Sequence, residues 1–191
     1  KITMATQKLK LKIRGVSPLL MHNGQLADPM NSTVKKIKLI SGKRQKTEAD
    51  FAEMAKLEWF GGLYLNKGKP CIPGEVLEAT IINGSRKSKR CKLAEQTVYC
   101  LDNYDLQYDG GRPPSELWED DNYRFVKNVR IGQATVMRTR PIFREWSSDI
   151  EVTFDDGVLN PADVKEIVKT AGESVGLMEW RPRFGRFEVV E

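Results

Sequence analysis

Cationic and aliphatic side chains alternate strictly near the start of the chain. The even positions from Lys8 to Arg14 are all basic, and the odd positions between them are Leu9, Leu11 and Ile13. Successive side chains of a β-strand point to opposite faces, so this period of two predicts a strand with one aliphatic and one cationic face. A glycine and a proline that follow soon afterwards end the strand.

Three segments carry the pattern of helices. Thr47 followed three positions later by Asp50 resembles a capping box, and the helix it opens is expected to stop at Gly61. A second helix is expected over 75–82, directly after a Pro-Gly pair. Asn160 is a good N-cap for a third helix, because a proline occupies the first helical position and apolar residues follow at helical spacing.

Extended patterns alternate with these helices. Residues 126–146 are rich in Val, Ile, Thr and Arg, residues 150–155 alternate between apolar and polar, and residues 187–190 form a final apolar run. This order predicts an α+β fold with a largely antiparallel sheet. A ferredoxin-like or RRM-like sheet is the natural candidate, with helices on one face and extended basic loops or a thumb-like insertion.

The chain is long enough for one folded unit. With 191 residues, of which 40% are hydrophobic, a single domain over 1–191 can bury a sizeable core. Residues 31–46 are polar, basic and interrupted by a Ser-Gly pair, so we expect a mobile basic loop there. Residues 93–146 are uneven in pattern, and we expect them to form an insertion or hairpin region.

Several classes of protein are excluded by composition. No window approaches 18 uncharged apolar residues, which excludes a membrane span. The start of the chain lacks the order of a signal peptide, so we expect a cytoplasmic protein. Three cysteines without a C-x-x-C pair and a single histidine argue against a disulfide framework and against a zinc site. We expect no metal and no cofactor.

The distribution of charge is more informative than the net charge of +5. Residues 35–46 hold six Lys or Arg and no acid, and residues 86–92 hold five in seven positions, whereas 102–121 hold seven acids and one Arg. Any one basic run can be merely a solvated face. Two such runs together with Arg-rich segments near the C-terminus favour an anionic polymer as the partner.

Single-stranded nucleic acid suits this pattern, because basic grooves follow phosphates while aromatic rings stack on bases. Several aromatic residues lie beside or among the Arg-rich segments, although most of them are expected in the core. We predict that nucleic acid is bound by residues of the two basic runs, of the Arg-rich strands and of the C-terminal loop: Lys35, Lys36, Lys38, Lys43, Arg44, Lys46, Arg86, Lys87, Lys89, Arg90, Arg138, Arg140, Arg144, Trp180, Arg181, Arg183 and Arg186.

Three segments in order resemble the RAMP superfamily of CRISPR-associated proteins. Residues 15–20 (GVSPLL) are similar to the loop after that family's opening strand, and residues 70–79 (PCIPGEVLEA) resemble the start of its first conserved helix. Residues 176–187 (GLMEWRPRFGRF) look like its C-terminal glycine-rich loop. The resemblance implies an RRM-like fold that grips single-stranded RNA, in a backbone subunit or in a phage-borne or stand-alone relative.

The resemblance also points to two residues with catalytic potential. A histidine near the position of His22 serves as general acid or base in the superfamily's processing endonucleases, a reaction that needs no metal. Asp28 resembles the loop aspartate with which some backbone subunits cut bound RNA with a metal. The plain alternatives are an ordinary loop histidine and an aspartate that opens a turn before Pro29.

Three hypotheses follow. The first is a non-catalytic protein that binds single-stranded RNA or DNA, RNA being favoured, and that assembles as a homo-oligomer along the strand. The second is an endoribonuclease that uses His22 or Asp28. The third is a phage-encoded protein that mimics or inhibits a subunit of a CRISPR effector complex. None of the three involves a membrane.

Overall fold

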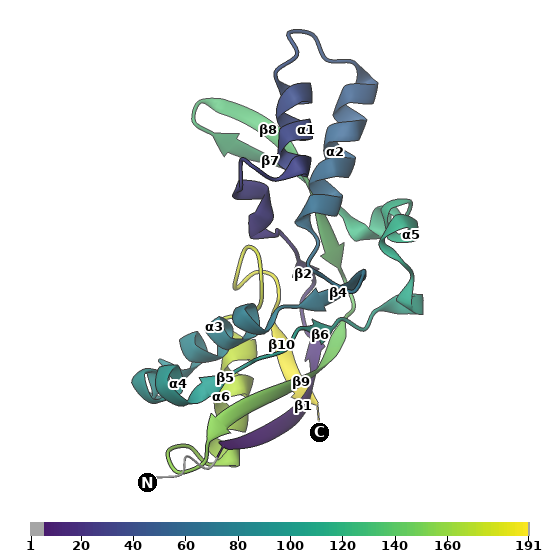
Figure 1. The fold of residues 1–191 in the computed structure, drawn as a ribbon. Coiled ribbons are helices and arrows are strands. Elements are labelled where there is room, and N and C mark those ends of the chain that lie inside the picture. Colours follow the sequence, from purple (N-terminus) through teal and green to yellow (C-terminus); the bar gives the residue numbers. More distant parts are fainter. Residues whose placement is uncertain (1–5, 191) are drawn as a thin grey trace.

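The computed structural model describes residues 6–190 and is organised around a four-stranded antiparallel sheet (Figure 1). In spatial order the strands are β10, β1, β9 and β5, and every neighbouring pair is antiparallel. Their bounds are Phe187–Val190 for β10, Thr6–Gly15 for β1, Ser147–Asp155 for β9 and Val98–Tyr99 for β5.

Two helices make the crossovers of this sheet. Helix α3 (Gly74–Ser85) lies between β1 and β5 in the chain, and α6 (Pro161–Ser174) lies between β9 and β10. The resulting β-α-β-β-α-β order, with the fourth strand beside the first and the third between the first and second, is the ferredoxin-like arrangement. The predicted α+β fold with an antiparallel ferredoxin-like sheet is confirmed.

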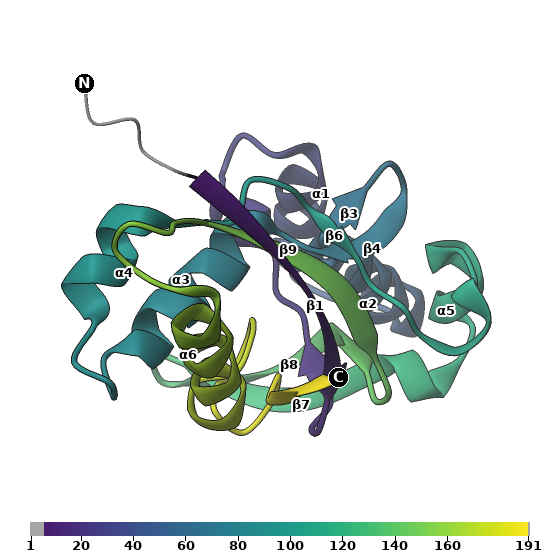
Figure 2. The ribbon, with the colours of Figure 1, turned by 90° about the horizontal axis from the view of Figure 1, so that it is seen from below.

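The alternating pattern of β1 becomes the two faces of the sheet. Ile13 is fully buried, and Leu9 and Leu11 pack against the same core. Helices α3 and α6 contact each other and lie on the same side of the sheet, as Figure 2 shows. The apolar stripe of α6, which includes Val164 and Ile167, therefore closes the core over the aliphatic face.

Two long insertions extend this sheet and its helices. The first, between β1 and α3, holds β2 (Leu19–Leu20), the 3₁₀ helix η1 (Gly24–Ala27), α1 (Ser32–Ser41), α2 (Glu48–Gly62), β3 (Leu65–Asn66) and β4 (Lys69–Ile72). The second, between β5 and β9, holds β6 (Tyr104–Asp105), η2 (Asp109–Gly111), α5 (Pro114–Trp118), η3 (Asp121–Tyr123), β7 (Arg124–Ile131) and β8 (Ala134–Phe143). The short helix α4 (Cys91–Thr97) precedes β5.

The insertions meet at the end of the molecule away from α4 and α6 (Figure 1). Strand β2 of the first insertion pairs with β8 of the second, which gives the three-stranded sheet β2-β8-β7. Strands β3, β4 and β6 form a second small sheet in the same way. The β7–β8 hairpin and the helices α1 and α2 thus form one projecting unit.

Residues 31–46 differ from the sequence-based expectation of a loop. Most of the segment is helix α1, and irregular chain begins only at Gly42. Asn31 caps the helix by accepting a hydrogen bond from the backbone N–H of Thr33. Val34 is buried, and α1 packs along α2. The exposed lysines obscured the helical pattern in the sequence, and the aliphatic side of α1 is covered by the next helix, α2.

The expected insertion over 93–146 also has different limits. It does contain a hairpin, β7–β8, but its first residues form α4 and then β5, an edge strand of the central sheet. The inserted chain therefore runs over 100–146. The predicted helices after Thr47 and Asn160 are confirmed together with their caps, the first of which is a reciprocal capping box with Asp50.

The crossing of α3 and α6 depends on a residue without a side chain. A Cβ atom on Gly84 would lie 2.5 Å from the Cβ of Ala171, closer than two carbons can pack. We expect Gly84→Ala to lower the free energy of unfolding by about 2 kcal/mol, since the helices must move apart. Urea denaturation measures this. Gly24→Ala is the control because nothing lies within 4 Å of its Cβ position, and equal losses in both variants would contradict the assignment.

Candidate nucleic-acid interface

An exposed aromatic ring stands beside the β7–β8 hairpin. Trp180, in the loop between α6 and β10, is 41% exposed. Its ring centroid lies 6.3 Å from that of Phe125 on β7 and 5.6 Å from that of Phe184. Phe184 is buried with Leu20 in a small core of its own, so one side of the indole is supported while the ring still reaches solvent.

Two cations lie against the same indole. The Nζ atom of Lys127, on β7, is 4.5 Å from the ring centroid of Trp180, and the guanidinium carbon of Arg183 is 5.8 Å from it. Both distances are in the range of cation–π attraction. Neither cation makes an ion pair with a carboxylate among residues 6–190, so both charges are available to a ligand.

The C-terminal loop that carries Trp180 is held at both ends by backbone hydrogen bonds. The N–H of Leu177 donates to the carbonyl of Gly185 over 2.9 Å, and the N–H of Gly185 donates to the carbonyl of Pro18 over 2.8 Å. The N–H of Glu179 donates to the carbonyl of Leu20. Gly185 has a φ of +75°, in the left-handed region that favours glycine. The loop is therefore tied to the segment that follows β1.

A pair of salt bridges fixes the arginines of β8. Glu58 on α2 is only 7% exposed, and its carboxylate accepts from Arg138 and, over 3.1 Å, from the backbone N–H of Thr139. Arg140 donates to Glu179 of the C-terminal loop over 3.0 Å. Strand β8 is thus joined to α2 by Arg138 and to the C-terminal loop by Arg140, the next residue on the same face of the strand.

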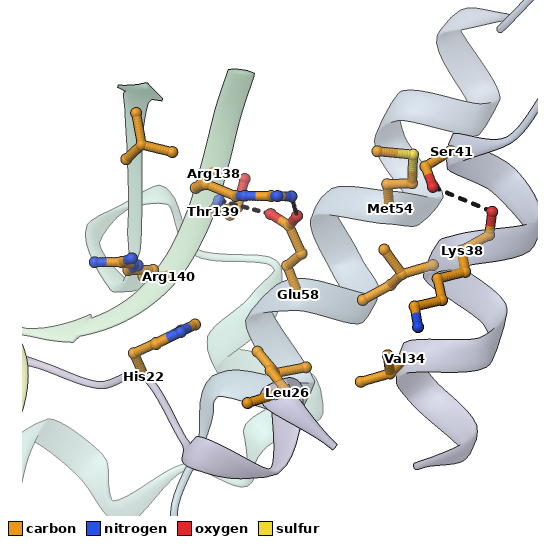
Figure 3. Close-up of a pocket in the computed structure, with 13 residues that line it drawn as sticks. His22, Leu26, Val34, Lys38, Ser41, Met54, Glu58, Arg138, Thr139 and Arg140 are labelled. Carbon is orange, nitrogen blue, oxygen red and sulfur yellow. Dashed lines mark hydrogen bonds and ion pairs between the residues drawn. The ribbon is translucent and has the colours of Figure 1, made fainter. Parts of the chain in front are cut away.

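A pocket of about 520 Å³ lies between α1, α2 and β8, and we call it the α1–α2–β8 pocket. Figure 3 shows His22, Leu26, Val34, Met54 and Arg140 arranged around it. Its lining combines aliphatic side chains from η1, α1 and α2 with basic side chains from α1 and β8. A second hollow of about 430 Å³ borders Trp180 and shares three residues of β7 and β8 with the pocket.

His22 lies at the junction of two hollows. It lines the α1–α2–β8 pocket and also a polar hollow of about 370 Å³ with Tyr64 and Arg181. Its side chain reaches solvent, yet the surrounding protein partly desolvates the imidazole and lowers its pKa below the ordinary 6.5. The positive charge of Arg140 acts in the same direction, and Glu179 opposes it. The imidazole is therefore neutral at neutral pH.

The predicted cations of the first basic run fall on and after α1. Lys35, Lys36 and Lys38 are exposed on the helix, and Lys38 lines the pocket. Lys43 is bound to Asp50, with its Nζ 2.5 Å from the carboxylate. Arg44 and Lys46 lie in the irregular chain before α2, where the Nζ of Lys46 donates to a backbone carbonyl. The helix, more than the loop, presents the free charges.

The second basic run is not brought to this interface. Glu75, at the start of α3, lines the polar hollow beside His22, whereas Arg86 follows the last residue of the same helix. They are eleven positions apart along the helix, which corresponds to roughly 16 Å. Lys87 and Lys89 continue from there, and Arg90 is paired with Asp163 at the start of α6. Arg144 is exposed in the turn between β8 and β9.

Two further predicted residues have structural contacts. The Nε–H and Nη2–H groups of Arg186 donate to the carbonyl of Glu173 in the last turn of α6, over 2.9 and 2.6 Å. The carboxylate of Asp28 accepts from the backbone N–H of Met30 over 2.8 Å, which is a turn-forming contact. In the part of the chain that the structure describes, no group of three or more His, Cys, Asp and Glu side chains is placed to hold a metal ion.

Sequence reasoning missed Phe125, Lys127, Glu58 and Glu179. The first two share one face of β7, since they alternate along the strand, and this period of two was the available signal. Glu58 looked like one more position on a helix. Its role depends on β8, which is 80 residues away in sequence, and no local pattern reveals it.

Comparisons with known proteins place the chain in no family. No protein-family description matches the sequence, and no curated protein matches it. Among solved structures it is similar to the crystal structure of Cmr6 from Pyrococcus furiosus, with a TM-score of 0.44 and 11% identity over 98% of this chain and 100% of that one. The fold assignment above rests on the strand order and the crossovers. Within residues 6–190, no helix is both long and apolar enough to cross a bilayer.

The surroundings of His22 give a test of the site. Because it is the single histidine of the chain, its proton NMR titration is free of overlap. We expect a midpoint below 6.5 in the unaltered protein and a higher midpoint in Arg140→Gln, which removes a cation and leaves Glu179 unpaired. Arg144→Gln, at an exposed turn, is the control and should leave the midpoint unchanged. A midpoint at or above 6.5 before substitution would refute this account.

Proposed function

We propose that this chain binds single-stranded nucleic acid, RNA in preference to DNA, along the surface that carries Trp180. The supporting observation is the exposed indole with Lys127 and Arg183 against it. A base stacks on such a ring while adjacent cations meet the phosphates on either side, the combination that single-strand binders use. Preference for RNA would come from contacts to the 2′-hydroxyl.

The open face of the central sheet is a poorer binding surface. Two of its four cations on β1 are bound by acids of the neighbouring strands, and the Nζ of Lys8 lies 2.5 Å from the carboxylate of Glu151. Arg14 is bound by Glu188 over 2.5 and 2.9 Å. Charges that are already paired contribute less to phosphate binding than free charges do, because the existing ion pair must first be broken. Trp180 and its unpaired cations have no such cost.

The α1 helix extends the proposed surface. Lys35, Lys36 and Lys38 are exposed on it, and Lys38 faces the pocket that adjoins the hollow beside Trp180. The loop that resembles the glycine-rich loop of the RAMP superfamily is the one that carries Trp180. We extend the proposal on that basis to an RAMP-like protein that assembles side by side along the strand, as a backbone subunit of a CRISPR complex would.

Fluorescence anisotropy with labelled single and double strands of RNA and DNA tests the proposal. Trp180→Ala should weaken binding to single strands about 10-fold, the size expected for one stacked base. Tyr99→Ala is the matched control, because Tyr99 is 40% exposed, lies on β5 of the central sheet and is distant in the chain from the cations of β7. Its affinity should equal that of the unaltered protein.

Two results would overturn the assignment. A loss in Tyr99→Ala with none in Trp180→Ala would move the binding surface to the central sheet. Absence of salt-sensitive binding to every strand would refute nucleic-acid binding. It would favour the alternative that the chain takes the place of a subunit in a CRISPR complex, as a phage-encoded mimic, and capture of such a complex would then be the next experiment.

A second candidate function, an endoribonuclease, is favoured by the state of His22. A neutral imidazole at an open junction between two hollows can take the proton from an RNA 2′-hydroxyl, and the nearby Arg140 can stabilise the charge that develops on the phosphate. Asp28 does not join this arrangement, because its carboxylate is used in a turn.

Cleavage of the labelled RNA on a gel separates the two functions. If His22 is the base, product with a cyclic phosphate end should form in EDTA and be lost in His22→Ala, while Asp28→Ala should cut at the original rate. Cutting that needs Mg²⁺ and is lost in Asp28→Ala would assign the chemistry to the aspartate instead. If the RNA stays intact under all conditions, cleavage is refuted and binding remains the proposed function.

A further inference from the structure

We propose that the α1–α2–β8 pocket receives one unstacked base of the bound strand, an inference that rests on the proposed function. The pocket has about 520 Å³, within the range typical of small-molecule sites. It opens beside the hollow that Trp180 borders, since Val129, Arg138 and Arg140 line both. A strand with one base stacked on Trp180 can therefore place a neighbouring base at the opening of the pocket.

The aliphatic side of the pocket suits the face of a base. This side consists of Leu26 from η1, Val34 and Ile37 from α1, and Met54 from α2. Leu26 is held in place because it packs on Gly61, where a Cβ atom would lie 2.6 Å from its Cδ2. An apolar wall built from three separate elements shields one face of a flat ring from water, which offsets part of the loss of stacking in the strand.

The basic side of the pocket suits the phosphate attached to that base. Lys38 is exposed at the pocket and makes no ion pair with the residues described. Arg140 lies across from it on β8 and shares its charge with Glu179. Arg138 is already neutralised by the buried Glu58, and this pair closes the pocket rather than attracting the ligand (Figure 3).

Polar groups within the pocket fit the edge of a base. The hydroxyl of Ser41 donates to the carbonyl of Lys38 over 3.1 Å, so its oxygen remains able to accept a hydrogen bond. Thr139 lies in the lining on the opposite side. A lipid chain would make no use of the basic side chains, whereas a nucleotide places its flat ring against the aliphatic wall and its phosphate beside Lys38 and Arg140, so the lining favours a nucleobase.

Filling the pocket tests the inference without changing any charge. Met54→Trp occupies the space from α2, and Phe51→Trp is the matched control because Phe51 lies on the same helix, is 57% exposed and does not line the pocket. Each variant is titrated with a single strand and with an abasic strand of equal length, which keeps every phosphate. The measured quantity is the dissociation constant of the abasic strand divided by that of the intact strand.

We expect Met54→Trp to reduce this ratio about 10-fold by weakening binding of the intact strand alone, whereas Phe51→Trp keeps the original ratio. An unchanged ratio in Met54→Trp, with strand binding intact, would overturn the pocket and leave the proposed function standing. No binding of any strand by the unaltered protein would overturn both. If Met54→Trp unfolds in a thermal melt, Ile37→Trp fills the same space from α1 and decides the question by the same criterion.

Discussion

The projecting unit depends on one buried carboxylate. Glu58, on α2, is buried away from water, and its negative charge is compensated by the guanidinium of Arg138 and by the backbone N–H of Thr139. A buried charge is tolerated only when its hydrogen bonds are complete, so the spacing between α2 and β8 is restricted to the one that satisfies it. The width of the pocket and the direction of the next arginine, Arg140, follow from that spacing.

The functional surface is assembled from segments that are distant in the chain. The first insertion contributes α1 and α2, the second contributes the β7–β8 hairpin, and the last loop contributes Trp180. Pairing of β2 with β8 brings the two insertions together, and the bond from Arg140 to Glu179 adds the loop. The ferredoxin-like sheet acts as the support from which these parts project, and two of its own cations, Lys8 and Arg14, are paired with acids.

Local signals predicted much of the fold but only part of the candidate site. The alternation in β1 and the caps at Thr47 and Asn160 depend on residues close in sequence, so they were found. Helix α1 was not predicted, because its aliphatic side chains are buried only by packing against α2. In the site, Trp180 and Arg183 were predicted from their loop, whereas the contribution of Lys127 depends on a contact between β7 and the C-terminal loop, two segments that are distant in the chain.

The two glycines that end α2 determine the geometry at a distance. A Cβ on Gly61 would meet Leu26, and one on Gly62 would lie 3.0 Å from Pro141, so the helix is seated directly on η1 and β8 at its base. Fifteen residues span roughly 22 Å, and a tilt of about 5° at the base therefore moves the far tip by about 2 Å. The absence of two side chains therefore fixes the base of α2, and the angle set there determines where the far end of α2, and the lysines of α1 packed along it, lie.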